Sequence, residues 1–173
     1  MFIGTIRKFK GKKYIIQKNN LYFITKKGRL QISVVLTGGV YDIIHPGHIY
    51  TLKKSKKMGD VLIISIATDE RVKKIKNRMP LNNQKRRVNL VSAIKYVDYA
   101  LVGSEKSIFN TVKKIKPDII TIGYDQRHNI IEVKKLIVKN KMKIKVVKLD
   151  SPIPKVKSSF IIKRNIQKEK DII

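Results

Sequence analysis

Apolar runs alternate with amphipathic stretches from residue 33 onward, in the pattern of a parallel sheet with crossover helices. The runs SVVL (33–36) and VLIISIA (61–67) are continuous, as expected for strands that are covered on both faces. Two more strands are predicted at 99–102 and 118–123. The run KIKVVKL (143–149) begins with alternation, which suits a sheet edge.

Helix signals separate these runs. The predicted helices begin at Pro46, Asn83, Ser107, near Asn129 and near Ser158, and Asp69 can cap a short helical turn. Gly59 is expected to close the first of them. The core face of the helix that Asn83 begins is predicted to be Val88, Val91 and Ile94. This order of elements predicts an α/β, Rossmann-like, doubly wound and mostly parallel five-stranded sheet.

Residues 1–32 show a different pattern. The β-type runs GTIRKF, KYIIQ and LYFIT are separated by turn residues, which indicates hairpins. We therefore expect a small basic antiparallel β appendage at 1–32, ahead of one α/β domain at 33–173.

Charge and composition narrow the class of protein. The chain of 173 residues has 40 Lys and Arg against 12 Asp and Glu, a net charge of +28. Lysine predominates and is spread along the chain, so we interpret most of this charge as solvated surface, with at most weak, non-specific nucleic-acid binding. Cysteine is absent, which excludes disulfides and thiolate chemistry. No run is long enough for a membrane span and no export signal is visible, so we expect a cytoplasmic protein without membrane partners.

The sharpest motif is the run from Gly38 to His48, GGVYDIIHPGH, between a predicted strand and a predicted helix. Glycines let the backbone approach a ligand, and a helix that begins at Pro46 presents free N–H groups to an anion. His45 and His48 are three residues apart, so both imidazoles can point at that anion. The alternatives for the pair alone are a metal site or two capping histidines.

Taken whole, this run resembles the HxGH signature of the cytidylyltransferase-like nucleotidyltransferases, including their G-x-[FY]-D lead-in. Further segments are similar to that family. Ala67 to Val72, followed by Lys74 and Lys76, resembles its [ST]-D-E-x-V segment and downstream lysines. Arg86-Arg87 and Tyr96-Val97-Asp98 resemble its E-R…YVD segment, with Arg86 in place of the family's glutamate.

The stretch from Lys116 to Gln126, KPDII followed by GYDQ, resembles the archaeal-type FAD synthases within this family. Ser158-Ser159-Phe160 is similar to the family's terminal S-[ST] motif. Lys157 and Ile162 depart from that motif, where the family has Ser and Arg.

The resemblance implies a set of site residues. Transition-state contacts to the phosphates are expected from His45, His48 and Lys76. Nucleotide binding is expected from Gly39, Val40, Tyr41, Asp42, Gly47, Gly123, Asp125, Ser158 and Ser159, with Lys74 and Lys157 as further phosphate contacts. Mg²⁺ is expected to be carried by phosphates and water, without a protein cage.

By the same resemblance, we expect AMP transfer from ATP to FMN with release of pyrophosphate. One alternative is a cytidylyltransferase that uses CTP and glycerol 3-phosphate or a similar phosphorylated alcohol. The other is a nucleic-acid-binding protein on a degenerate nucleotidyltransferase scaffold, against which the intact HxGH run argues. The family commonly forms dimers, and the sequence leaves a homodimer open.

Overall fold

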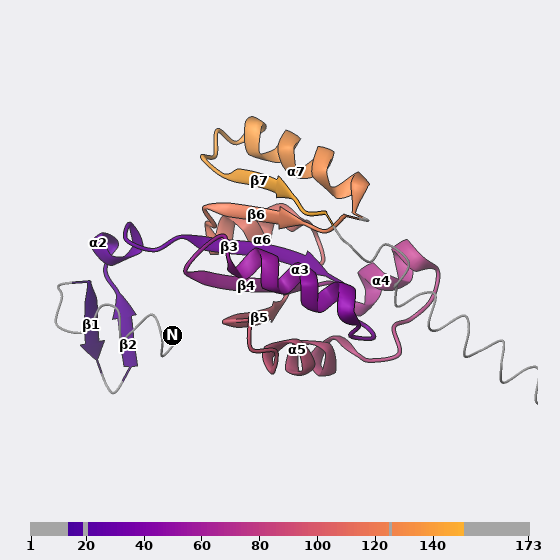
Figure 1. Cartoon of the computed structure of the whole chain (residues 1–173). Helices are drawn as coiled ribbons and strands as arrows, with labels where there is room; N and C mark the ends of the chain where they lie inside the picture. Colours follow the sequence, from indigo (N-terminus) through magenta and orange to yellow (C-terminus); the bar gives the residue numbers. More distant parts are fainter. Residues whose placement is uncertain (1–13, 19–20, 125, 151–173) are drawn as a thin grey trace, which may run out of the picture.

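The computed structural model describes residues 14–18, 21–124 and 126–150. Five strands form one parallel sheet in the order β5-β4-β3-β6-β7 (Figure 1). They are β3 (Val34–Gly39), β4 (Val61–Ile66), β5 (Tyr99–Val102), β6 (Ile119–Ile122) and β7 (Lys145–Lys148). All five lie where the apolar runs predict them, and the α/β Rossmann-like class is confirmed.

Helices cover both faces of this sheet. They are α3 (Pro46–Lys56), α4 (Asp69–Lys76), α5 (Gln84–Ser92), α6 (Ile108–Ile115) and α7 (Arg127–Lys139). None of the helices among the described residues is long and apolar enough to span a bilayer. The helix predicted near Ser158 lies outside the described residues.

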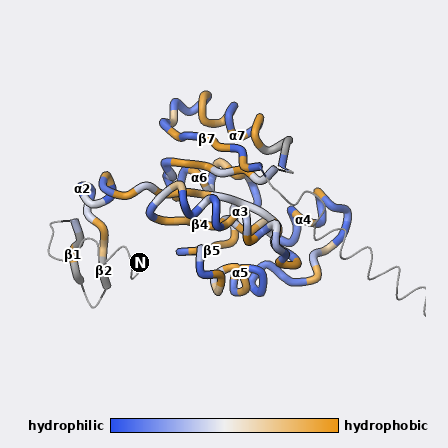
Figure 2. The backbone as a smooth tube through the Cα atoms, in the orientation of Figure 1, coloured by the Kyte–Doolittle hydropathy of each residue, from blue (hydrophilic) through white to orange (hydrophobic). Residues whose placement is uncertain are grey.

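Alternate residues of the strands fill two separate cores. Val35 of β3 packs with Leu52 of α3 and Val91 of α5 on one face. Leu36, the next residue, packs with Val112 of α6 and Val133 of α7 on the other. Because successive strand residues point to opposite faces, the continuous apolar run buries both faces at once. In Figure 2, where hydrophobic residues are orange, they accordingly lie mainly along the strands and on the helices that pack against them.

Local signals set most helix starts. Pro46 occupies the first turn of α3, and Asn83 and Ser107 cap α5 and α6 as predicted. The cap of α4 is Thr68 rather than Asp69, since the Thr68 hydroxyl accepts the Arg71 N–H. Asp69 instead bonds α5, as described below.

The first crossover helix ends earlier than predicted. Its last helical residue is Lys56, not a residue beside Gly59. Gly59 is needed for a close approach, because a Cβ there would lie 2.6 Å from Cγ2 of Val35 and 2.8 Å from the Ser33 carbonyl oxygen. The glycine therefore lets the chain turn tightly into β4.

The N-terminal segment contains a hairpin of its own. Strands β1 (Ile15–Lys18) and β2 (Leu21–Ile24) pair antiparallel and form a separate sheet. A four-residue helix, α2 (Lys26–Arg29), follows; the sequence pattern does not predict it. Arg29 donates to the Lys116 carbonyl and to the Asp118 carboxylate at 2.9 Å, which joins α2 to the start of β6. The run GTIRKF lies outside the described residues, and the division at residue 32 stays a prediction.

Candidate active site

A cavity of about 410 Å³ opens at the carboxyl ends of β3, β4 and β6. Ligands bind at this edge of open parallel sheets, and the volume is in the range of small-molecule sites. Of the residues predicted for the site, the structure brings to this cavity Gly39, Val40, Tyr41, His45, Gly47, His48, Lys76 and Gly123. The strand-to-helix run and the α4 lysine therefore share one cavity.

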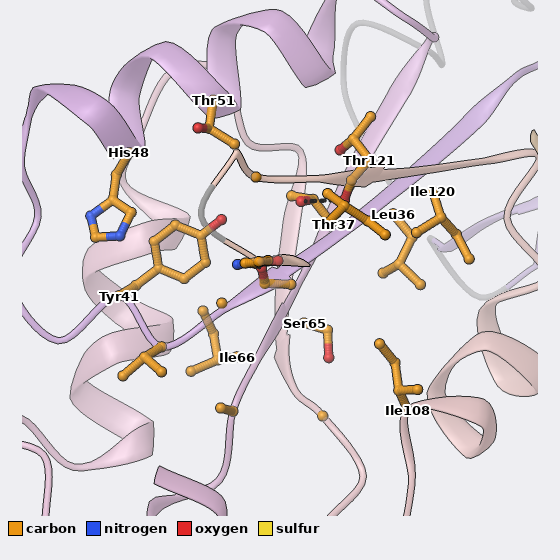
Figure 3. A pocket seen from close by; sticks show the side chains of 18 of the residues that line it. Leu36, Thr37, Tyr41, His48, Thr51, Ser65, Ile66, Ile108, Ile120 and Thr121 are labelled. Atoms are coloured by element: carbon orange, nitrogen blue, oxygen red, sulfur yellow. Dashed lines mark hydrogen bonds between the residues drawn. The ribbon is translucent and has the colours of Figure 1, made fainter. Parts of the chain in front are cut away.

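The two histidines stack on one another at the start of α3. His45 occupies the N-cap position and His48 lies in the first turn, because the helix begins at Pro46. Their ring centroids are 3.8 Å apart with an interplanar angle of 27°. The Tyr41 ring lies on the other side of the pair, 4.7 Å from the His48 ring. Figure 3 shows His48 and Tyr41 side by side at one end of the cavity.

Burial is the main influence on the protonation of His48. It lowers the pKa of His48 to about 3, assisted by the nearby His45 and Lys76, while the Ile43 backbone acts in the opposite direction. His48 is therefore a neutral imidazole at pH 7. Within the described part of the chain, its buried Nδ1 atom has no hydrogen-bond partner. A neutral imidazole can still donate one N–H bond to a phosphate oxygen.

Tyr41 holds the loop in an uncommon conformation. Its φ is 53°, in the left-handed region that non-glycine residues seldom adopt, and its side chain is buried. The ring packs against Gly39, where an added Cβ would lie 2.7 Å from the Tyr41 ring. The absence of a side chain at Gly39 thus sets the position of the ring that contacts His48.

We predict that Gly39→Ala lowers catalytic turnover by roughly tenfold or more, because a misplaced contact residue disturbs the reacting geometry. The Tyr41 ring must move away from the new methyl group, and the His48 ring must follow. Gly38→Ala is the matched control, since its Cβ would meet only the Ser65 carbonyl oxygen at 3.3 Å as its closest neighbour. Equal turnover for the two variants, measured by product formation, would contradict this link.

Asp42 lies beside the cavity without lining it. Its carboxylate is fully buried, and accepts bonds from the Asn82 backbone N–H at 3.0 Å and from Arg78 at 3.2 Å. The Asn82 side chain also donates to the Asp42 carbonyl at 2.9 Å. Both carboxylate oxygens are thus engaged in holding the segment before α5 against the loop, and the structure does not bring Asp42 to the cavity.

Arg87 is the centre of a second buried network. Its side chain is 0% exposed although it belongs to the sequence QKRR. The guanidinium donates to Val40 O at 2.7 Å, to Asn82 O at 2.9 Å and to the Asp69 carboxylate at 2.6 Å. Asp69 in turn accepts the N–H of Gln84. This one residue therefore ties α5, the start of α4 and the glycine-rich loop together.

Helix α4 supplies the basic rim of the cavity. Lys76 lines it, and so does Arg71, which sequence reasoning placed in a family segment without giving it a role. Lys74 is exposed and does not line the cavity. An anionic ligand at the histidines would lie in the field of Lys76 and Arg71.

The loop after β6 closes another side of the cavity. Gly123, Tyr124 and Gln126 line it, and the Gln126 side chain donates to the Gly38 carbonyl at 3.1 Å. Asp125 lies outside the described residues. So do Lys157, Ser158 and Ser159, and their assignments stay predictions.

The described residues do not supply an oxygen cage for Mg²⁺. No group of three or more His, Asp or Glu among them could hold a metal ion, and Asp42 is already engaged on both oxygens. The expectation that phosphates and water carry Mg²⁺ stays a prediction.

Several cavity residues carry no motif signal. They are Thr37, Thr51, Ser65, Gly103, Ser104, Ile108 and Thr111. Most of them share a position near the end of a strand or the start of a helix, beside the carboxyl edge of the sheet; Thr51 lies in the middle of α3. An inventory of strand ends could have found most of them, because that edge is where α/β sheets bind ligands.

Comparison with known proteins agrees with this geometry. Residues 36–165 match the family model described as cytidylyltransferase-like. The chain is 42% identical to the FAD synthase of Picrophilus torridus over 76% of this chain and 94% of that protein. It is 47% identical to the FAD synthase of Methanosphaera stadtmanae, over 66% and 79%. Among solved structures, a lipopolysaccharide core biosynthesis protein from Thermoplasma volcanium is 38% identical, with a TM-score of 0.66 over 69% of this chain and 98% of that one.

Proposed function

Since the chain belongs to the cytidylyltransferase-like family, we propose that it is a nucleotidyltransferase that transfers AMP from ATP to FMN, forming FAD and pyrophosphate. The observation that carries this proposal is the stacked pair His45 and His48 at the start of α3, facing a cavity with a basic rim. The FAD synthases among its relatives support the choice of substrates.

The reaction requires positioning and charge stabilisation rather than a covalent enzyme intermediate. An FMN phosphate oxygen attacks the α-phosphorus of ATP in line, the bond to the bridging oxygen breaks, and pyrophosphate leaves. Negative charge shifts toward the leaving group during this step. Fixed donors aimed at those oxygens stabilise the transition state without reorganising.

The chain offers three kinds of donor for this task. The first turn of α3 presents the Gly47 backbone N–H, since those of His48 and Ile49 donate to the His45 carbonyl. The positive end of the helix dipole favours phosphate there. His48, neutral at pH 7, donates one N–H beside His45. Lys76 and Arg71 attract the triphosphate and stabilise the negative charge that builds up on pyrophosphate. Mg²⁺ would accompany the triphosphate and neutralise part of its charge.

A product analysis tests this proposal. The protein is incubated with Mg²⁺ and a mixture of ATP, CTP, FMN and glycerol 3-phosphate, and the products are separated by chromatography. We expect FAD and pyrophosphate in equal amounts. Formation of CDP-glycerol without FAD would contradict the flavin assignment while leaving the nucleotidyltransferase chemistry in place. Absence of any pyrophosphate would contradict the enzymatic function itself.

A further inference from the structure

The two ends of the cavity differ in chemistry. One end carries the histidines, Tyr41 and the cations of α4. The opposite end is walled by aliphatic side chains from β3, β6 and α6: Leu36, Ile120 and Ile108 (Figure 3). Leu36 and Ile120 are only 2% and 3% exposed, so this wall is fixed by the core beneath it. Ile108 is half-buried and presents the accessible part of this apolar wall to a ligand.

The threonine hydroxyls on β3, β6 and α6, the elements that carry this wall, are already engaged within the protein. Thr37 donates to the Thr121 carbonyl at 2.9 Å, and the Thr121 hydroxyl shares a 2.7 Å hydrogen bond with Ser55. The hydroxyl of Thr111 accepts the Ser104 N–H at 2.9 Å. A ring that must be recognised by hydrogen bonds along its edge would gain little from them, whereas a ring with an apolar edge loses nothing.

The geometry of the reaction allows only one ring system at this end. Both reacting phosphates must meet at the histidines, so the rings of donor and acceptor lead away from that point along different paths. Adenine is read through polar atoms on its edge, which an aliphatic wall of Leu36, Ile120 and Ile108 cannot bond. Isoalloxazine ends in a dimethylbenzene ring, which is apolar.

We propose that the aliphatic end of the cavity binds the isoalloxazine ring of FMN, with its dimethylbenzene edge against Ile108 and the ribityl chain spanning the cavity toward His48. This assignment rests on the proposed FAD synthesis. Ile108 is its specificity-determining contact, because it lines the cavity as the first residue of α6 and is half-buried, whereas Leu36 and Ile120 are buried.

The test compares Ile108→Ala with Ile115→Ala in the full chain. Both isoleucines lie on α6, are half-buried and pack against the same core, but only Ile108 lines the cavity. We expect Ile108→Ala to raise the KM for FMN about tenfold, the effect of lost apolar contact with a ligand, and to leave the KM for ATP within about twofold. Ile115→Ala should change neither KM. Ile108→Val, a milder change, should give an intermediate KM for FMN.

A flavin analogue that lacks both ring methyl groups identifies the edge in contact. The wild-type protein should bind this analogue more weakly than FMN, and Ile108→Ala should discriminate much less between the two, because the partner of the methyl groups is gone. A rise in the KM for ATP instead of FMN would place adenine at this end and overturn the proposal. Equal discrimination by both proteins would overturn it as well.

Two different results would show that the chain does not synthesise FAD and that the flavin ring does not bind at the aliphatic end of the cavity. Wild-type protein that forms no FAD from ATP and FMN contradicts the proposed function directly. FMN binding is then measured alone by flavin fluorescence: binding weakened in Ile108→Ala but not in Ile115→Ala supports the ring site. Wild-type protein that does not bind FMN overturns it.

Discussion

Replacing His48 by alanine is expected to lower kcat for FAD formation by about 10²-fold or more, the loss typical of removing one transition-state donor. The His48 imidazole stacks on His45 and lies beside Tyr41 at the start of α3. No other side chain of the described cavity wall can place an N–H donor at the same point. Steady-state kinetics check the result. Tyr50→Phe serves as control, since Tyr50 lies on the same helix but does not line the cavity. Turnover within a few fold of wild type would contradict the assignment of His48.

The same variant should alter the acid stability of the protein. The pKa of His48 is about 3 in the folded state against 6.5 for an ordinary histidine exposed to water, so the unfolded chain binds an extra proton between these pH values. The free energy of unfolding therefore falls as pH drops from 6.5 toward 3. His48→Ala removes this contribution. In urea titrations, the free energy of unfolding of the variant should therefore fall less steeply between pH 6.5 and 3 than that of the wild type. Above pH 6.5 the His48 contribution should not vary with pH.

Replacing Arg87 by methionine is expected to reduce the free energy of unfolding by about 3 to 5 kcal/mol, the usual effect of breaking a buried ion pair from one side. The Asp69 carboxylate would lose its cation, and the carbonyl oxygens of Val40 and Asn82 would lose their donor. Denaturant unfolding measures the change. Arg86→Met is the matched control, because Arg86 is exposed and it is the backbone N–H, kept in the variant, that donates to the Asn83 side chain.

Arg87 is also expected to position the catalytic loop. Its bond to the Val40 carbonyl fixes the residue before Tyr41, whose ring contacts His48. Arg87→Lys keeps a charge near Asp69 but cannot make the three directed bonds, so kcat should fall while the protein stays folded. If Arg87→Met and Arg86→Met unfold at the same denaturant concentration, the network does not contribute as described.

The sequence pattern predicted the sheet because the signals for it are local. A continuous apolar run at 61–67 needs only its own residues to indicate a buried strand, and Pro46, Asn83 and Ser107 begin helices through bonds within one turn. The exception is instructive. Thr68 and Asp69 are both good caps, and their roles are decided by Arg87, which recruits Asp69 from 18 residues away.

Long-range partners explain what the sequence could not predict at the site. Asp42 has the sequence context of a ligand-binding residue, yet Asn82 and Arg78 occupy its carboxylate from 40 and 36 residues away. Arg87 looks like one more surface cation in a basic run until tertiary structure buries it. Ile108 gives no motif signal at all, because an aliphatic contact depends on cavity shape rather than on residue type.

The place of β3 at the centre of the sheet has a consequence for how the protein folds. β3 can pair with β4, and β4 with β5, as soon as residues to 102 are available. The other neighbour of β3, β6, lies far along the chain, since Thr37 and Thr121 are 84 residues apart. Closing so long a loop is entropically slow, so docking of β6 is expected to be a late step. The histidine end of the cavity forms with the early part, β3 to β5, whereas the wall formed by Ile120 is added when β6 docks. A partly folded chain therefore carries the catalytic histidines without a complete pocket for substrate.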